Sequence, residues 1–327
     1  MATAKKVLVT GIGGNVGQGI IRNIRAAFPD LHIAGCNISA FSAGNHLCDS
    51  FHEVPYSYDK EYIPTIVKIV RQEGIDLIIP STDHEVFYLS ANAGVISAKI
   101  AASGTTAAEI YLDKLFSYDH HQKFNIPFAD TCLPSLYKGE FGDIIAKPRK
   151  GRGSRGLHVN PLVWKDFNDE EYIIQRLYKG EEITTAFYVN RGGALHGHIT
   201  MQRSLDNGAT TQCKVIRQYD PVVEPILEAM IRHSDIKGSA NLQSIVSPDG
   251  SIHPFEVNCR ISGTNSIRSH FGFEDVKYTI LEYLFNEAAP KPSIQKGLAV
   301  RILMDVIYPD KEDFNECRDN TTDFLLF

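Results

Sequence analysis

Short apolar runs alternate with amphipathic segments over the first third of the chain. The runs predict buried strands at 7–10, 33–36 and 76–80, and apolar residues at helical spacing predict helices at 18–27 and 60–73. Strands that alternate with helices are typical of a parallel sheet with crossover connections. We therefore predict an α/β lobe with a parallel sheet over residues 1–110.

A different pattern begins after residue 110. A helix is predicted at 113–125, and beyond it apolar and polar positions alternate as they do in half-buried strands. The predicted strands lie at 143–147, 157–160, 172–175, 183–190 and 195–202, and a helix at 222–232 precedes a hairpin of 240–246 and 252–258. This mixture predicts an α+β domain at 111–290, with a smaller part at 111–180 and a larger part at 181–290. Residues 291–327 are expected to add one strand, at 298–308, and a tail.

Composition and charge narrow the classes of function. The chain has 327 residues, 43% of them hydrophobic, and a net charge of -6 without long runs of like charge. Nucleic-acid binding is not expected, because it depends on clustered Lys and Arg. No apolar run approaches the roughly 18–20 residues needed to cross a bilayer, and the six cysteines are scattered. We expect a cytoplasmic protein with reduced thiols, no membrane partner and a homodimeric assembly.

A glycine-rich turn follows the first predicted strand. The glycines of residues 11–17 can bring backbone amides and a helix N-terminus close to a phosphate, as in dinucleotide enzymes. The second strand, however, leads into Cys36 and Asn37, where an NAD site usually has an acidic residue for the ribose. We expect a structural or substrate-facing turn, with a nicotinamide oxidoreductase or epimerase as the alternative.

A lysine and a second glycine-rich loop indicate a phosphate site. Lys147 ends an apolar strand, where its ammonium group needs an anionic partner. The loop at 151–156 can present backbone amides and a hydroxyl, so Gly153, Ser154 and Gly156 are candidate phosphate contacts. Taken alone, the lysine would also fit an ordinary salt bridge, and the loop an ordinary hairpin turn. Together they predict a lid that closes over phosphates.

A polar segment after the next strand is suited to the rest of a nucleotide. Gln175 ends that strand, and the backbone groups of Arg176 and Tyr178 can bind the edge of an adenine. Glu182 can accept hydrogen bonds from ribose hydroxyls, whereas Glu181 is expected in solvent. The alternative for Glu182 is an ordinary surface charge.

The final hairpin predicts a metal site. If residues 249–250 form a two-residue turn, Gln243 pairs with Glu256 and Asn241 pairs with Asn258, all on one face. A three-residue loop with a bulge would shift the register by one and spoil this pairing. Carboxylate and amide oxygens are ligands that Mg²⁺ prefers, so Gln243, Glu256 and Asn258 are predicted to bind Mg²⁺, or Mn²⁺ in its place.

The order and spacing of these segments resemble the ATP-grasp superfamily, in particular the short relatives of the carbamoyl-phosphate synthase large chain. The matching segments are 113–115, 145–148, 175–182 and the Glu-x-Asn-x-Arg motif at 256–260. The departures are Cys259, where proline is usual, and Gln175, where glutamate is common. The resemblance covers about residues 5–290 and is specific from Asp113 onward.

The resemblance implies a preATP-grasp, Rossmann-like lobe followed by an ATP-grasp domain whose two parts clamp ATP. It implies that Lys114 and Lys147 contact ATP phosphates. It further implies an ATP-dependent carboxylate-amine ligase, in which a small-molecule carboxylate forms an acyl phosphate and an amine or similar nucleophile displaces the phosphate. Arg260, Arg203 and Lys214 are the candidate catalytic residues. A non-catalytic, regulatory ATP-binding protein is the alternative.

Two further segments are candidates for substrate contacts. Residues 81–85 follow a parallel strand, where open α/β sheets usually receive ligands. Residues 262–264 and Arg268 follow the metal hairpin and are candidates for the lining of an acceptor pocket.

Overall fold

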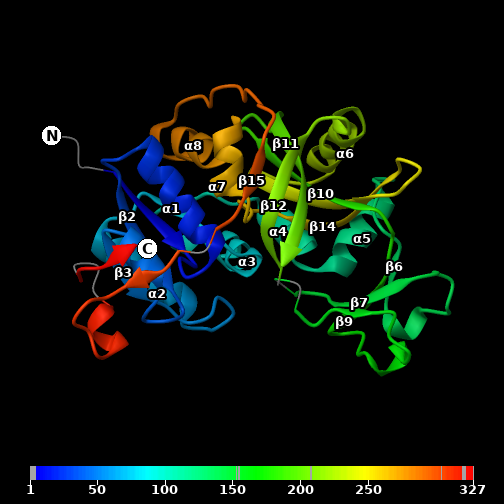
Figure 1. Cartoon of the computed structure of the whole chain (residues 1–327), viewed down its shortest axis with the longest axis horizontal. Helices are drawn as coiled ribbons and strands as arrows, with labels where there is room; N and C mark the ends of the chain where they lie inside the picture. The colour runs from blue at the N-terminus through cyan, green and yellow to red at the C-terminus, as the bar shows by residue number, and fades with distance from the viewer. Residues whose placement is uncertain are drawn as a thin grey trace.

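Three main sheets follow one another along the chain (Figure 1). The computed structural model describes residues 5–151, 153, 155–206, 208–302, 304–318 and 322–326. A five-stranded sheet is built within residues 6–100, a four-stranded sheet within 131–176, and a six-stranded sheet within 181–300.

The five-stranded sheet is parallel throughout. Its strands are β1 (Lys6–Thr10), β2 (His32–Asn37), β3 (Ser50–Glu53), β4 (Leu77–Ile79) and β5 (Lys99–Ile100), in the order β3-β2-β1-β4-β5. The helix α1 (Asn15–Ala27) covers one face, and α2 (Tyr62–Glu73) and α3 (Asp83–Ala91) cover the other. Alternate residues of β1 enter the two cores, because adjacent side chains of a strand point to opposite faces. The predicted α/β lobe is confirmed.

Two consecutive helices lead from this lobe to the rest of the chain. They are α4 (Thr105–Leu112) and α5 (Lys114–Lys123). The Asp113 carboxylate caps α5, because it accepts a hydrogen bond from the backbone N of Leu115 at 3.0 Å. The sequence pattern did not predict α3 or α4, since neither helix carries a marked apolar stripe.

The four-stranded sheet forms a small separate layer, at the lower right of Figure 1. It is antiparallel, in the order β6 (Thr131–Cys132), β9 (Tyr172–Arg176), β7 (Ile144–Pro148) and β8 (His158–Val159). Its apolar residues pack with Tyr137 and Trp164 into a core of their own. The glycine-rich loop joins β7 to β8, so we call this layer the lid sheet.

The six-stranded sheet is also antiparallel. Its order is β14 (Ile252–Asn258), β13 (Gly238–Val246), β10 (Glu181–Val189), β11 (Leu195–Asp206), β12 (Ala209–Ile216) and β15 (Leu298–Val300). The helix α6 (Asp220–His233) packs on one face, and α8 (Asp275–Thr279) with Phe273 packs on the other. β12 was not among the predicted strands, because polar residues occupy much of its length. The predicted α+β fold of this part is confirmed, and β15 extends its sheet beyond the predicted limit at residue 290.

The loop of the β13–β14 hairpin differs from its prediction. It has three residues, because the N of Ser247 donates to the O of Ser251 at 2.9 Å. Gly250 has a φ of 86°, as the last residue of such a loop requires. The predicted two-residue turn at 249–250 is therefore wrong.

The pairing predicted for this hairpin is nevertheless correct. Phe255 is an extra residue in β14, and the bulge that it forms shifts the register back by one. As a result, Gln243 pairs with Glu256, and Asn241 pairs with Asn258. The odd loop length and the bulge compensate for each other.

The end of the chain returns to the first lobe. The strand predicted at 298–308 is wrong as a single element, because β15 ends at Val300 and β16 (Val306–Ile307) pairs with β17 (Leu325–Leu326) in a separate sheet. The rings of Tyr308 and Phe324 contact that of His46, with centroids 5.2 and 4.8 Å away. In the part of the chain that the structure describes, no helix has the length and apolar character required to traverse a bilayer.

Candidate active site

A cleft of about 660 Å³ opens where the three sheets meet. The first lobe contributes Gly11 and residues 81–85, which follow β1 and β4. The strand order reverses between β1 and β4, and ligands of open α/β sheets usually bind at such a point. The lid sheet contributes Lys147 and the glycine loop, and the six-stranded sheet contributes side chains of β10, β13 and β14.

Lys147 projects from the end of β7 into the cleft and is 7% exposed. Its Nζ donates to Oε1 of Gln175 at 2.6 Å and lies 4.5 Å from the ring centroid of Phe255. Burial lowers the pKa of Lys147 to about 8, although the Glu256 carboxylate opposes this shift. Among the described residues no carboxylate forms a salt bridge with Lys147, so the ordinary salt bridge does not account for it. A buried cation in this state is suited to an anionic ligand.

Lys114 reaches the same region from the start of α5. It is 8% exposed, and its Nζ donates to the O of Gly151 at 3.3 Å. The start of α5 is tied to the lid sheet, because Arg149 forms an ion pair with the buried Asp113 at 2.9 Å. The backbone N of Lys114 also donates to the O of Arg149 at 3.0 Å. Both predicted phosphate lysines are therefore brought to one cleft.

The glycine loop connects β7 and β8 along the edge of the cleft. Gly151 and Gly153 line the cleft. Gly156 has a φ of 69°, and a Cβ placed there would come within 3.0 Å of Cγ of Pro148, so a glycine is needed at this position. Ser154, the predicted hydroxyl contact, lies outside the described residues.

The polar segment after β9 lines the cleft beside the lid sheet. Gln175 is held between Lys147 and Thr131, since its Nε2 donates to the hydroxyl of Thr131 at 3.0 Å. The Tyr178 ring is stacked on that of His253, with centroids 3.6 Å apart, and Arg176 lies over it at 5.1 Å. Gln175, Arg176 and Tyr178 all line the cleft.

A chain of polar contacts joins the predicted ribose and metal residues. Arg203 donates to Oε1 of Glu182 at 2.7 Å and also to Oε1 of Gln243. Gln243 in turn donates to Oδ1 of Asn258 at 3.1 Å, and Asn258 donates to Glu256 at 3.3 Å. The structure therefore brings Glu182 and Arg203 together with all three predicted metal ligands.

The three metal candidates form a donor set that fits Mg²⁺. Burial alone would raise the pKa of Glu256, but the ammonium groups of Lys114 and Lys147 lower it below its usual value. Among the described residues, no three His, Cys, Asp or Glu side chains form a metal cage. Mg²⁺ does not need one, because it commonly binds one or two protein oxygens together with phosphates and water. The amides of Gln243 and Asn258 engage Arg203 and each other, so they would have to exchange these partners for a metal.

Three comparisons with known proteins bear on this cleft. Residues 7–104 match the family profile described as the PylC-like, N-terminal domain. No curated protein matches the sequence. N5-carboxyaminoimidazole synthetase from Staphylococcus aureus, complexed with ADP, superposes with a TM-score of 0.76 at 10% identity, over 91% of this chain and 82% of that one.

Two other solved structures have the same architecture. Carboxyaminoimidazole ribonucleotide synthase from Aspergillus clavatus, complexed with ATP, has a TM-score of 0.73 at 15% identity, covering 94% of this chain and 82% of that one. The biotin carboxylase domain dimer of Hydrogenobacter thermophilus 2-oxoglutarate carboxylase, with MgADP, ADP and bicarbonate, has a TM-score of 0.69 at 14% identity, covering 90% and 73%. This chain has the ATP-grasp fold. The first lobe is its preATP-grasp part, and the lid sheet and the six-stranded sheet enclose the ATP-grasp cleft.

An acidic residue of the ATP-grasp cleft was not predicted as a partner of the metal motif. Asp83, at the start of α3, forms an ion pair with Arg260 at 2.8 Å and accepts a hydrogen bond from Asn258 at 3.4 Å. Arg260 is therefore at the cleft, but it faces the first lobe. Only the position of residues 81–85 after β4 pointed to this region, because the two partners are far apart in sequence.

Lys214, a predicted catalytic residue, is not brought to the ATP-grasp cleft. It is exposed on β12, where Cys213 pairs with Arg203. Neighbouring residues of a strand point to opposite faces, so Lys214 lies on the face away from Arg203 and the cleft.

Arg268 does not line an acceptor pocket, because it is fully buried. It forms an ion pair with Asp275 at 2.5 Å and donates to the hydroxyls of Ser262 and Thr264, both at 2.8 Å. Ser262 lines the cleft and donates to Oδ1 of Asn241 at 3.1 Å. Arg268 therefore supports the cleft-lining segment from behind.

Proposed function

We propose that this protein is a Mg-ATP-dependent ligase that joins a carboxylate to an amine through an acyl phosphate. The observation that carries the proposal is the convergence of two buried lysines, Lys114 and Lys147, with the oxygen donors of Glu256 and Asn258 at one cleft. A triphosphate with its metal needs these two kinds of group in one place.

Each group has a role in this proposal. Lys147 and Lys114 neutralise phosphate oxygens, while the amides of the glycine loop cover them. The segment at 175–178 holds the adenine. Glu182 binds the ribose through Oε2, because Arg203 donates to its Oε1. Gln243, Glu256 and Asn258 would hold Mg²⁺, which would supply positive charge that stabilises the transferred phosphoryl group.

The reaction has two steps. A carboxylate oxygen of the substrate attacks the γ-phosphorus, and the bond to ADP breaks. The amine nitrogen then attacks the acyl carbon, phosphate leaves, and the amine loses a proton. Positioning, charge stabilisation and exclusion of water contribute the rate enhancement, so no covalent nucleophile of the protein is required. Arg260 is proposed to release Asp83 and bind the phosphoryl group.

The similar structures support the proposal that this protein binds ATP together with Mg²⁺. They were determined with ADP, with ATP, and with MgADP and bicarbonate. At 10–15% identity, they support the fold and not a particular substrate. The carboxylate and amine are therefore proposed only as small molecules.

The decisive experiment measures ligand binding and turnover separately. MgATP should raise the unfolding temperature of the protein, and ligand at about 100 times its Kd adds roughly 2.7 kcal/mol of stability. Mass spectrometry of reactions with an acid-plus-amine library should then identify a condensed product with one ADP. MgATP binding without product from any pair would favour the regulatory alternative. Stabilisation by NAD(H) and not by MgATP would refute both.

The nicotinamide alternative has weaker support in the structure. Tyr56 and Lys60 have the Tyr-x-x-x-Lys spacing of some dehydrogenases, but they lie in a turn and not on one helix face. Gly17 packs against the backbone of Gly11, since a Cβ there would lie 2.7 Å from its O. This contact explains why residue 17 is a glycine without a bound dinucleotide.

The cytoplasmic location and the homodimer stay predictions.

A further inference from the structure

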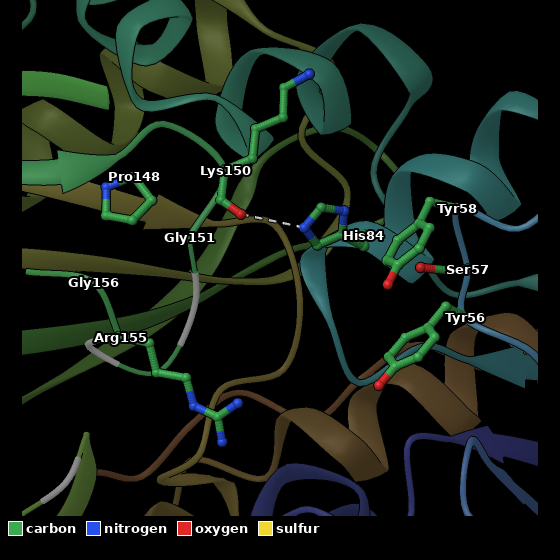
Figure 2. A pocket seen from close by; sticks show the side chains of 9 residues that line it. All are labelled: Tyr56, Ser57, Tyr58, His84, Pro148, Lys150, Gly151, Arg155 and Gly156. Carbon is green, nitrogen blue, oxygen red and sulfur yellow. Dashed lines mark hydrogen bonds between the residues drawn. The ribbon is translucent and has the colours of Figure 1, made fainter. Parts of the chain in front are cut away.

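A second cavity adjoins the ATP-grasp cleft, between the first lobe and the lid sheet (Figure 2). Its volume is about 320 Å³. One wall is the segment at 56–58 in the first lobe. The opposite wall is formed by Pro148, Lys150, Gly151, Arg155 and Gly156. Tyr56, His84 and Arg155 line both spaces, so the two are continuous. We call this second cavity the side pocket.

Two tyrosines form the first-lobe wall of the side pocket. The rings of Tyr56 and Tyr58 are stacked, with centroids 5.1 Å apart and planes at 8°. The residues are 43% and 59% exposed. Figure 2 shows both hydroxyl groups pointing toward the glycine loop across the pocket. Two phenol O–H donors are thus directed into a space that reaches the cleft.

A cation stands on the opposite wall. Arg155 is exposed, and among the described residues it forms no salt bridge. Figure 2 shows its guanidinium group extending into the gap between the walls. Lys150, in the same loop, differs: its ammonium group points away, and its carbonyl oxygen accepts a hydrogen bond from Nε2 of His84 at 3.3 Å. Of these two described cations, Arg155 therefore faces the pocket and Lys150 does not.

The base of this loop is closely packed. Ideal Cβ atoms at Gly151 and Gly156 would lie 2.9 and 3.0 Å from the Pro148 ring. Arg155 directly precedes the second of these contacts, so its backbone is held near β7.

We propose that the side pocket binds an anionic group of the acceptor, so that the acceptor is an amine that also carries a carboxylate or a phosphate. This inference rests on the proposed ligase function. A guanidinium group and two phenol hydroxyls are the donors that an oxyanion requires. The pocket opens into the cleft, so a ligand anchored there can direct its amine toward the activated carboxylate.

The test uses full-length protein saturated with MgADP and isothermal titration. The probes are the α-amino acids and ethanolamine phosphate, each compared with the amide or alcohol that has the same amine without the anion. At least one anionic probe should bind, and its neutral counterpart should not. The phosphate and carboxylate probes show which anion is preferred. Equal binding of the neutral counterpart, or no binding by any anionic probe while MgADP still binds, overturns the inference.

Variants locate the anion. Arg155→Ala should weaken the binding of the anionic probe by about 10- to 100-fold, the effect of losing a charge-assisted hydrogen bond. The matched control Lys150→Ala removes the same charge from the same loop and should change binding by less than about twofold, because its ammonium group points away. Equal losses in the two variants would show a general charge effect and reject the site.

Two further measurements separate this inference from the proposed function. The double variant Tyr56→Phe with Tyr58→Phe keeps the rings but removes both hydroxyls, and it should weaken the binding of the anionic probe by about 3- to 10-fold. If Arg155→Ala instead weakens MgATP and leaves the probe unchanged, Arg155 belongs to the triphosphate and the inference fails while the ligase proposal stands. If wild-type protein does not bind MgATP at all, the proposed function itself fails.

Discussion

The two walls of the ATP-grasp cleft are supported in different ways. The oxygen donors lie on paired strands of the six-stranded sheet, and the fully buried pair of Arg268 and Asp275 supports the adjoining segment. The glycine loop on the other wall is exposed where the structure describes it. Gly151 and Gly156 pack against Pro148, and the backbone of Gly153 lies close to Gly208. The comparison shows that one wall is fixed by side chains of the core, whereas the described part of the other is held by backbone contacts of an exposed loop. We expect the first to set metal geometry and the second to respond to ligands.

The largest loss of stability should come from removing the ion pair that supports the cleft wall formed by the six-stranded sheet. Arg268→Ala leaves the Asp275 carboxylate buried without its cation, which should lower the free energy of unfolding by about 3–5 kcal/mol. Urea unfolding measures this loss. The control Lys277→Ala breaks the nearby half-exposed pair with Glu274 and should cost less than about 1 kcal/mol. Similar losses would mean that the buried pair gives no special support.

The next largest effect should be a loss of turnover when the Glu256 carboxylate is removed from the six-stranded sheet. Glu256→Gln keeps the shape of the side chain but removes the one carboxylate of the metal set, so we expect turnover of MgATP to fall by at least about 100-fold. The unfolding temperature should stay close to that of the wild type. Glu181, which accepts a hydrogen bond from the Tyr219 hydroxyl and is not among the residues that line the cleft, offers a control, since Glu181→Gln should keep its activity. Normal turnover in Glu256→Gln would exclude it as a metal ligand.

A smaller effect is expected at the lid sheet. Lys147→Ala removes a buried cation from the phosphate site, and the Kd for MgATP should rise by about 10- to 100-fold. Isothermal titration gives this value directly. Lys179→Ala, which removes a lysine whose side chain is 81% exposed, is the matched control and should bind normally. An unchanged affinity in Lys147→Ala would remove the residue from the site.

The smallest effect is a dependence on pH. Burial lowers the pKa of Lys147 to about 8, so the free protein loses this charge as the pH rises above that value. A bound triphosphate favours the charged form and raises the pKa, so binding at pH about 9 should take up as much as about one proton, and affinity should fall as pH rises. Titrations in two buffers with different ionisation enthalpies measure the uptake. The heats of Lys147→Met should not depend on the buffer.

Much of the fold follows from local patterns in the sequence, and part of the site does too. The pairing of Gln243 with Glu256 came from counting along a hairpin, although the loop assumed in that count was wrong. The cluster of Lys147 with its neighbours follows from strand ends and loop residues that are close in sequence. Such features are local, and the alternation of side chains specifies them.

The contacts that could not be predicted join distant segments. Asp83 meets Arg260 only because the first lobe is placed against the β14 end of the larger sheet. The prediction for Lys214 was wrong for a different reason. The face of β12 on which Lys214 lies depends on the pairing of Cys213 with Arg203, and the composition of the strand does not reveal this pairing. Tyr56 and Arg155 face each other across two lobes, and no sequence spacing relates them.

The extra residue at Phe255 constrains how this hairpin can vary. If the loop lost a single residue while Phe255 remained, every side chain on one arm would turn over and the metal oxygens would leave the cleft. Insertions and deletions here should therefore be tolerated only as compensating pairs, one at the tip and one at the bulge.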